Sequence, residues 1–327
     1  MQTHRRKFLI ASLAWLACAA FPARAQDYPS RAITLVVPFP AGGPGDTLGR
    51  ILAEHMRGSL KQPVIIENVG GAAGSIGAGR VARAVPDGHT LVLGYLGTHV
   101  INGAIYNLPY DVRTDFEPVA MLPGQPLMIV ARKAMPAGDL KELIAWLKAN
   151  PDKASQGTAG IGSIGHIAGL FFQKETGTRF QFVPYRGVAP VMQDLVAGQI
   201  DVAFSVPVAS MQQVRAGLIK AYAVTAGSRL SSASEIPTTD EAGVPNLHLS
   251  LWQGLWAPKG TPRDAIAKLN DAVIAALSDP AVSRKLADQG FEMPPREKMS
   301  PDALGAHQQA EIDRWWPILG AANVKGE

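Results

Sequence analysis

The fold is decided by residues 35–46, which read Leu35-Val36-Val37-Pro38-Phe39-Pro40-Ala41-Gly42-Gly43-Pro44-Gly45-Asp46. They form a short apolar strand, a glycine-rich loop and the first turn of an amphipathic helix. The design recurs at residues 157–166, Gly157-Thr158-Ala159-Gly160-Ile161-Gly162-Ser163-Ile164-Gly165-His166. Such a loop leaves backbone N–H groups without helical partners and directs them at whatever lies above the helix start. The two loops together predict that one anion is held from two sides.

The first 25 residues predict export. Arg5-Arg6-Lys7 is a basic segment, residues 8–21 are almost uninterruptedly apolar, and Ala23-Arg24-Ala25 gives a small-x-small cleavage pattern. We therefore expect residues 1–25 to be a cleavable signal peptide, and the mature chain to begin at Gln26 in the periplasm. The arginine pair is compatible with the Sec route and with the twin-arginine route.

Two anchored alternatives concern the same segment. An apolar run of 14 residues is short for a membrane span, which needs about 20. Cys18, the only cysteine, would suit lipidation, but Trp15 stands where a lipoprotein signal has Leu, Val or Ile. Cleavage after Ala25 removes Cys18 and leaves no thiol for a disulfide, a nucleophile or a metal site.

The charge balance gives no sign of a nucleic-acid partner. The full chain has 31 Lys and Arg against 27 Asp and Glu. Four of the cations and none of the acids lie in residues 1–25, so the mature chain has 27 of each. A nucleic-acid binder would need a clustered basic face. About 300 mature residues are enough for two domains with separate cores.

Strand and helix patterns alternate along the mature chain. Apolar runs predict strands at 33–39, 64–69, 90–95, 127–132, 180–185, 200–206 and 220–225. Helical spacing follows both glycine-rich loops, precedes Gly198 as a C-terminal stop, and begins again at Pro262. Asp46 and Ser163 are the expected N-caps after the two loops. The alternation predicts an α/β protein with mostly parallel sheets flanked by helices.

Two segments, 121–125 and 245–254, interrupt this rhythm with proline, glycine and extended-type residues. We interpret them as two crossings between domains. The first lobe would then comprise residues 26–123 plus 250–327, and the second lobe residues 124–249. A chain that crosses twice forms a hinged clamp with its ligand cleft between the lobes. A single domain followed by a helical tail is the alternative that the pattern leaves open.

An ordered series of short motifs covers nearly the whole mature chain. It begins with residues 38–46 and continues at 71–77, 86–91, 108–111, 116–119, 162–166, 183–187, 194–202, 237–245 and 256–262. The series resembles the substrate-binding receptors of tripartite tricarboxylate transporters, also called Bug proteins, whose signature is PF-x-AGG-x-x-D. Each match is weak alone, but their number and order make the resemblance specific.

The resemblance implies a two-lobed periplasmic binding protein, a Venus-flytrap clamp without catalysis, that captures a small organic carboxylate. It also implies delivery of the ligand to the membrane permease subunits of a tripartite tricarboxylate transporter. We expect a monomer that needs no cofactor and no metal. Carried over by position, the ligand-binding residues are Phe39, Ala41, Gly42, Gly43 and Asp46 on one wall, Gly160, Gly162, Ser163 and His166 on the other, and Thr98, Arg186 and Ser205 nearby.

One position departs from the family pattern. Many relatives have an acid directly after the Asp-Val-x-Phe strand, whereas Ser205 follows Phe204 in this chain. An acid there would pair with a ligand ammonium or hydroxyl group, so its absence disfavours an amino acid as ligand. The resemblance leaves dicarboxylates, tricarboxylates and aromatic acids open.

Several candidates also have a structural interpretation. The loop glycines allow a tight turn. Asp46 suits a cap better than a ligand contact, because an acid repels a bound carboxylate. Ser163 can cap its helix and still reach a ligand, and His166 suits a packed core position equally well. Arg186 is either a bidentate carboxylate partner or a solvated surface residue.

Two enzyme-like strings are rejected. Residues 160–165 fit G-x-G-x-x-G, but an exported protein meets no nicotinamide pool in the periplasm. Residues 73–77 resemble a nucleophile elbow without the strand that must run into the serine. The seven histidines show no metal-binding spacing. Besides transport, the sequence leaves open a ligand-sensing partner of a two-component sensor kinase and a periplasmic enzyme.

Overall fold

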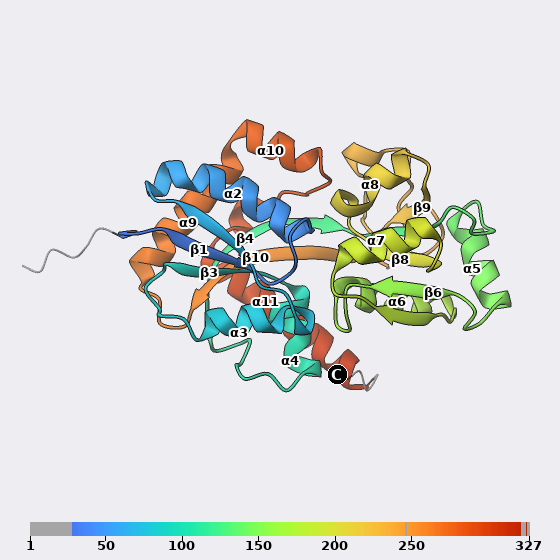
Figure 1. The fold of residues 1–327 in the computed structure, drawn as a ribbon, viewed down its shortest axis with the longest axis horizontal. Coiled ribbons are helices and arrows are strands. Elements are labelled where there is room, and N and C mark those ends of the chain that lie inside the picture. The colour runs from blue at the N-terminus through green and yellow to red at the C-terminus, as the bar shows by residue number, and fades with distance from the viewer. Residues whose placement is uncertain (1–27, 246, 322–324, 326–327) are drawn as a thin grey trace, which may run out of the picture.

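The computed structural model describes residues 28–245, 247–321 and 325. Two lobes lie side by side, each built on its own five-stranded sheet (Figure 1). The predicted signal peptide, with Cys18, lies outside the described residues. The α/β class and the two-lobed architecture predicted from the sequence are confirmed.

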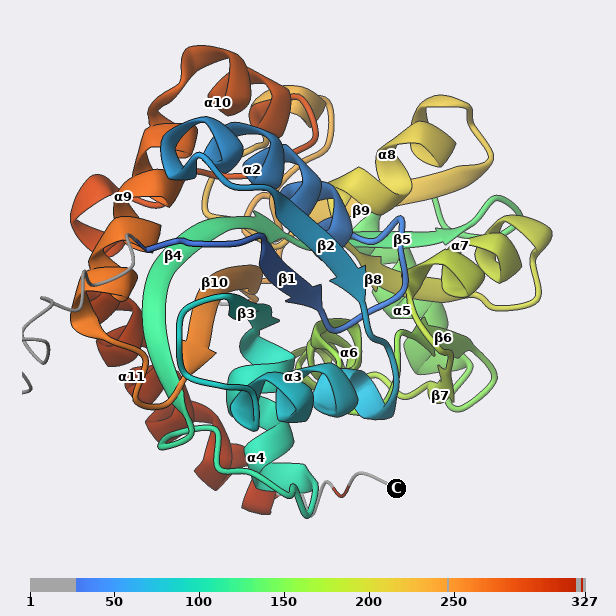
Figure 2. The same ribbon diagram turned by 60° about the vertical axis from the view of Figure 1, so that its left-hand side comes forward.

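The sheet of the first lobe has the order β2-β1-β3-β10-β4. β1 pairs in parallel with β2 and β3, and β10 pairs antiparallel with β3 and β4 (Figure 2). The strands are β1 (Ile33–Val37), β2 (Val64–Asn68), β3 (Thr90–Tyr95), β4 (Phe116–Pro126) and β10 (Ser250–Pro258). The helices are α2 (Pro44–Leu60), η1 (Ala72–Gly74), α3 (Ser75–Ala82), η2 (Gly97–Ile101), α4 (Asn102–Ile105), α9 (Arg263–Ser278), α10 (Pro280–Ala287), η4 (Arg296–Lys298) and α11 (Pro301–Ala321).

The sheet of the second lobe repeats this arrangement, with the order β7-β6-β8-β5-β9. β6 is parallel to β7 and β8, and β5 is antiparallel to β8 and β9. The strands are β5 (Met128–Arg132), β6 (Ser155–Thr158), β7 (Gln181–Pro184), β8 (Val202–Ser205) and β9 (Ile219–Val224). The helices are α5 (Leu140–Ala149), α6 (Ile164–Thr176), α7 (Val188–Ala197), α8 (Pro207–Arg215) and η3 (Ser231–Ala233).

The chain passes from one sheet to the other twice. The first strand after each passage runs in the opposite direction to the other strands of its sheet. β4 ends at Pro126 and β5 begins at Met128, so the first change falls at Leu127. β9 ends at Val224 and β10 begins at Ser250, so residues 225–249 bring the chain back. β5 and β10 are therefore the first strands after a change, and each runs against the other four of its sheet. The lobe boundaries at 123/124 and 249/250 stay a prediction.

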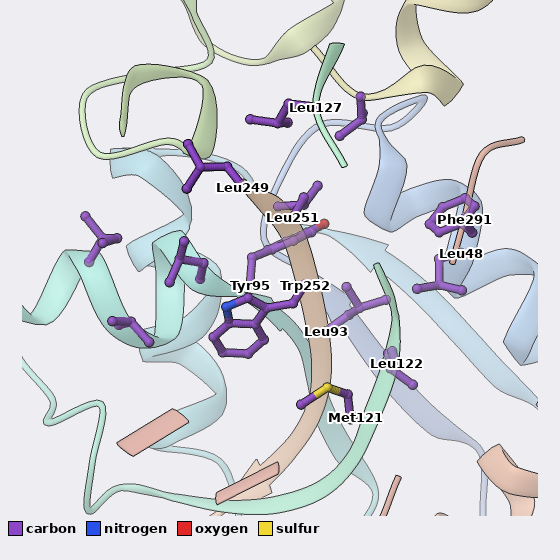
Figure 3. Packing of buried hydrophobic residues seen from close by; sticks show 14 of the residues in the cluster. Leu48, Leu93, Tyr95, Met121, Leu122, Leu127, Leu249, Leu251, Trp252 and Phe291 are labelled. Atoms are coloured by element: carbon purple, nitrogen blue, oxygen red, sulfur yellow. The ribbon is translucent and has the colours of Figure 1, made fainter. Parts of the chain in front are cut away.

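β10 separates two environments because successive side chains of a strand point to opposite faces. Leu251 lines the space between the lobes. Trp252 points the other way (Figure 3), and its indole Nε1 donates a hydrogen bond to Glu311 of α11. Further along, Trp256 is fully buried and stacks on His99 with a centroid distance of 4.0 Å. These contacts fix the return strand to the first lobe.

A candidate ligand site between the lobes

A cavity of about 90 Å³ lies between the two sheets. Five segments meet around it: the β1–α2 loop, the end of β3, the start of α6, the start of α7, and β10. They contribute Phe39, Pro40, Ala41, Gly43, Pro44, Gly45, Asp46, Tyr95, Gly97, Ala159, Ser163, Ile164, Arg186, Gly187, Val188, Ala189, Pro190 and Leu251. Both lobes therefore build the cavity, and its lining is mainly apolar.

The first-lobe wall is the N-terminus of α2. Gly43 is the N-cap, with an extended backbone at φ −84° and ψ 174°, and Pro44 is the first helical residue. The amide N–H groups of Gly43 and Gly45 donate no hydrogen bond to any of the described residues. Gly45 has no room for a side chain, because a Cβ would overlap the Tyr95 hydroxyl. This close approach holds the free N–H groups at the cavity wall.

Asp46 is not the N-cap that the sequence predicted. It lies in the first turn of α2, and its Oδ2 accepts hydrogen bonds from Gly42 N and Arg50 Nε, both at 3.0 Å. Its Oδ1 makes an ion-pair contact at 2.9 Å with Arg50 Nη2. Burial alone would raise the pKa of Asp46, but the bonds from Arg50, Gly42 and Asn68 hold it below its ordinary value. Asp46 is therefore charged, and its carboxylate holds the loop in place through the bond from Gly42.

The second-lobe wall begins at α6. Ser163 is its N-cap, as predicted, and its Oγ accepts a hydrogen bond of 3.4 Å from His166 N. Ser163 also lines the cavity, so its hydroxyl hydrogen is available for a ligand there. Within the described chain, the amides of Ile164 and Gly165 have no hydrogen-bond acceptor. The cap and the ligand contact are therefore compatible in one side chain.

A third helix start, that of α7, lines the same cavity, and the sequence predicted only Arg186 of its lining residues. Gly187 is the N-cap, in a conformation with φ 135° that favours glycine. Arg186 lines the cavity, and its exposed guanidinium forms no ion pair with any residue that the structure describes. It is the one basic side chain among the described lining residues. The α7 start lies close to Pro40 of the first lobe, since a Cβ on Gly187 would be in contact with that ring at 3.5 Å.

Two predicted backbone donors are already used inside the protein. Gly42 N–H donates to Asp46 Oδ2. Gly162 N–H donates to His166 Nδ1 at 3.3 Å, and Gly162 packs against Ile105 of the first lobe. Neither residue lines the cavity. Both have positive φ values, +85° and +80°, so their role in the structure is to turn the loops.

Four other predicted residues lie outside the cavity. Thr98 is fully buried, and its Oγ1 accepts a hydrogen bond of 2.9 Å from Tyr95 N. His166 packs edge-on against Phe182, and burial lowers its pKa to about 4, which keeps the imidazole neutral. Gly160 lies at the loop turn with φ +118°. Ser205 lines a smaller adjoining cavity of about 50 Å³, which shares Ser163 and Leu251 with the main one.

The lobes touch one another around the cavity, so the described arrangement is closed. Tyr106 Oη donates a hydrogen bond of 2.9 Å to the carbonyl of Ile161 in the other lobe. A Cβ on Gly97 would lie 3.4 Å from the carbonyl of Gly162. Phe171 of α6 meets Trp315 of α11 edge-on, with centroids 6.3 Å apart. These contacts join the two lobes beside the cavity.

The double role of Ser163 gives a first prediction. Ser163→Ala is expected to lower the free energy of unfolding by about 1 kcal/mol through the lost cap. It should also weaken ligand binding about fivefold or more, since a hydrogen bond contributes roughly 1 kcal/mol. Asp139→Ala is the matched control, because Asp139 caps α5 through a 2.8 Å bond from Glu142 N, away from the cavity. Urea unfolding and calorimetric titration separate the effects: equal ligand affinity in both variants would leave Ser163 a cap alone.

Two further features were sought among the described residues, a metal site and a membrane-spanning helix. These residues contain no group of three or more His, Cys, Asp or Glu side chains placed to hold a metal ion. A search of the same residues finds no helix that is both long and apolar enough to span a bilayer. The cavity itself is bordered by three helix starts, those of α2, α6 and α7. A two-lobed fold with this site defines a solute-binding protein of the clamp class.

This chain belongs to the tripartite tricarboxylate transporter family receptors, whose family model matches residues 48–324. It is 38% identical over 301 residues to the UPF0065 protein in the TAR-I ttuE-ttuC' intergenic region of Agrobacterium vitis, covering 92% of this chain and 87% of that protein. It is 33% identical over 308 residues to BugT of Bordetella pertussis, covering 94% of each chain.

Solved structures agree with this assignment. The periplasmic binding protein BugD matches with a TM-score of 0.85 and 37% identity, over 92% of this chain and all of that one. MatC of Rhodopseudomonas palustris with bound malate gives 0.84 and 39%, over 89% of this chain and 100% of its own. R. palustris Rpa4515 with adipate gives 0.87 and 34%, over 92% and 100%. The chain is therefore a solute-binding receptor of a periplasmic family.

Proposed function

We propose that this receptor binds a small organic carboxylate between its lobes and delivers it to the membrane subunits of a tripartite tricarboxylate transporter. The observation that carries the proposal is the convergence of three helix N-termini, from α2, α6 and α7, on one cavity. Free N–H groups and the positive end of the helix dipole both favour an anion there. Arg186 adds a full positive charge on the second-lobe side.

The hydrogen bonds available in the cavity are strong enough to account for micromolar binding of an acid. Hydrogen bonds to a charged group contribute about 1.5–3 kcal/mol each, and micromolar affinity needs about −8 kcal/mol. A few such bonds and the apolar contact with Leu251, Ile164 and Val188 reach that value. Closure must be driven by ligand contacts that exist only in the shut state. Donors on two lobes meet this condition, because both reach one ligand only when the lobes are together.

Three further points support a carboxylate without an ammonium group. The structures of MatC with malate and of Rpa4515 with adipate show acids bound to relatives. In this chain, Asp46 is the one carboxylate among the described lining residues, and it is held by Arg50 and Gly42. Ser205 keeps the end of β8 uncharged. A ligand ammonium would therefore lack a counter-ion.

The proposal also covers the export, the cellular location and the domain division of the protein. Residues 1–25 act as a signal peptide, and the mature chain works in the periplasm as a monomer. We place the lobe boundaries at 123/124 and 249/250, and Leu127 and residues 225–249 are the segments that join the two sheets. Each of these points rests on the sequence and on the character of the family.

A thermal-shift screen of the chain from Gln26 onward tests the proposal. The panel pairs each carboxylic acid with its uncharged amide. An acid at a hundredfold excess over its dissociation constant should stabilise the fold by about 2.7 kcal/mol, and its amide should have no effect. A panel in which no acid raises the melting temperature would contradict the proposal. Recovery of the acid unchanged after incubation separates a receptor from an enzyme.

A further inference from the structure

Tyr95 is the lining residue whose chemistry is least explained by the fold. It ends β3, is only 4% exposed, and borders the cavity. Its ring packs edge-on against Phe39, with centroids 5.4 Å apart. Its hydroxyl forms no hydrogen bond with any residue in the described part of the chain. Because the hydroxyl belongs to a residue of the cavity wall and has no protein partner there, it is free to bond a ligand in the cavity.

The Tyr95 ring is held rigidly in this position. A Cβ on Gly45 would overlap the hydroxyl and lie 2.7 Å from Cζ, so the first turn of α2 rests directly on the ring. Leu251 of β10 lies beside it (Figure 3) and also lines the cavity. Burial and the nearby Asp46 carboxylate both raise the pKa of Tyr95. The hydroxyl therefore keeps its proton and is a hydrogen-bond donor.

The size of the cavity restricts what can meet this donor. The main cavity and the adjoining one measure about 90 and 50 Å³. Even together they are smaller than the roughly 150 Å³ of an engineered protein cavity that binds benzene. The cavity therefore favours a compact acid over one with a long chain.

We propose that Tyr95 is the residue that sets ligand length: its ring closes the first-lobe end of the cavity, and its hydroxyl donates a hydrogen bond to an oxygen at the far end of a short aliphatic acid. The inference rests on the proposed function, since it assigns one end of the same ligand. The near end meets the second-lobe helix starts, those of α6 and α7, and Arg186. A longer chain collides with the ring before the lobes can shut.

The test uses calorimetric titration of the mature chain with succinate and adipate. The wild type should bind succinate more tightly than adipate. Tyr95→Phe keeps the volume and removes the donor, so succinate binding should weaken about tenfold or more. Tyr95→Ala opens the end of the cavity and should reverse the order of succinate and adipate. Tyr110→Phe is the matched control, because Tyr110 also packs edge-on against a phenylalanine, Phe116, but lies away from the cavity.

The outcomes separate the two proposals. If the wild type binds none of the acids, and the wider thermal-shift panel is also negative, both the proposed function and the role of Tyr95 fall. If the wild type binds an acid but Tyr95→Phe binds it equally well, with Tyr95→Ala keeping the wild-type order of chain lengths, only the role of Tyr95 is wrong. Tighter binding of adipate than of succinate by the wild type would contradict the length limit directly. Tyr95→Phe keeps the test decisive should Tyr95→Ala fail to fold.

Discussion

Gly43→Val is expected to fold and to lose ligand binding about a hundredfold or more. Gly43 has an extended backbone that any residue adopts, and a Cβ there would meet only the Pro40 carbonyl, at 3.7 Å. The added side chain enters the cavity that Gly43 lines. It covers the free N–H groups at the start of α2, and two charged hydrogen bonds of about 1.5 kcal/mol each correspond to more than a hundredfold in affinity.

Two companion variants isolate the cause. Valine is a poor N-cap, and threonine of the same size is a good one, so Gly43→Thr keeps the helix start and should still block the ligand. Gly58→Val lies in the same helix with no atom within 4 Å of its Cβ, away from the cavity. It should leave affinity unchanged. Calorimetry on the three variants decides: full affinity in a folded Gly43→Thr protein would remove the α2 loop from the site.

Asp46→Ala is expected to lower the free energy of unfolding by about 2–4 kcal/mol at pH 7. The substitution removes the acceptor of Gly42 N–H and the partner of Arg50, and it empties a position where the carboxylate is only 5% exposed. The folded protein lowers the pKa of Asp46. The contribution of the carboxylate is therefore complete above its unfolded pKa of about 3.9. It is lost as the pH falls through the lower folded value.

The stability gap between wild type and Asp46→Ala should accordingly narrow below about pH 4. Urea unfolding at pH 7 and near pH 2.5 measures it. Asp111→Ala is the control, because Asp111 also pairs with an arginine, Arg113, and also has a lowered pKa, but lies at the surface. Exposed pairs contribute about 1 kcal/mol or less. A gap that is equally small for both variants at pH 7 would contradict the structural role of Asp46.

The fold could be predicted because its hydrophobic pattern is local. Each of the seven predicted strands corresponds to an observed one, with ends that differ by up to two residues. β6 was not predicted as a strand because its residues, Ser-Gln-Gly-Thr, have no apolar run, although three of the four are buried. Residues 121–125 and 245–254 were interpreted as crossings because proline and glycine break the pattern. In the structure, residues 121–125 lie in β4 and residues 250–254 in β10, two long strands with irregular pairing, between Leu251 and Gln253 for example.

The site could be predicted only in part. Glycine-rich loops show in sequence, so Gly43 and Ser163 were found and do line the cavity. Gly42 and Gly162 could not be told apart from free donors, because their amides are used by Asp46 and His166 through bonds that depend on side-chain orientation. The loop before α7 has a single glycine, Gly187, and so does not show the glycine-rich pattern that marked the other two helix starts. Tyr95 followed from no motif, since its role depends on the contact with Gly45 in a distant segment.

A crystal structure of the complex with the tightest-binding acid of the panel tests the central claim most directly. The account predicts a carboxylate oxygen within hydrogen-bonding distance of the amide nitrogen of Gly43 or Gly45, and a further ligand oxygen bound by the start of α6 or α7. A ligand held by one lobe alone, or one bound outside the space between the two sheets, would contradict it.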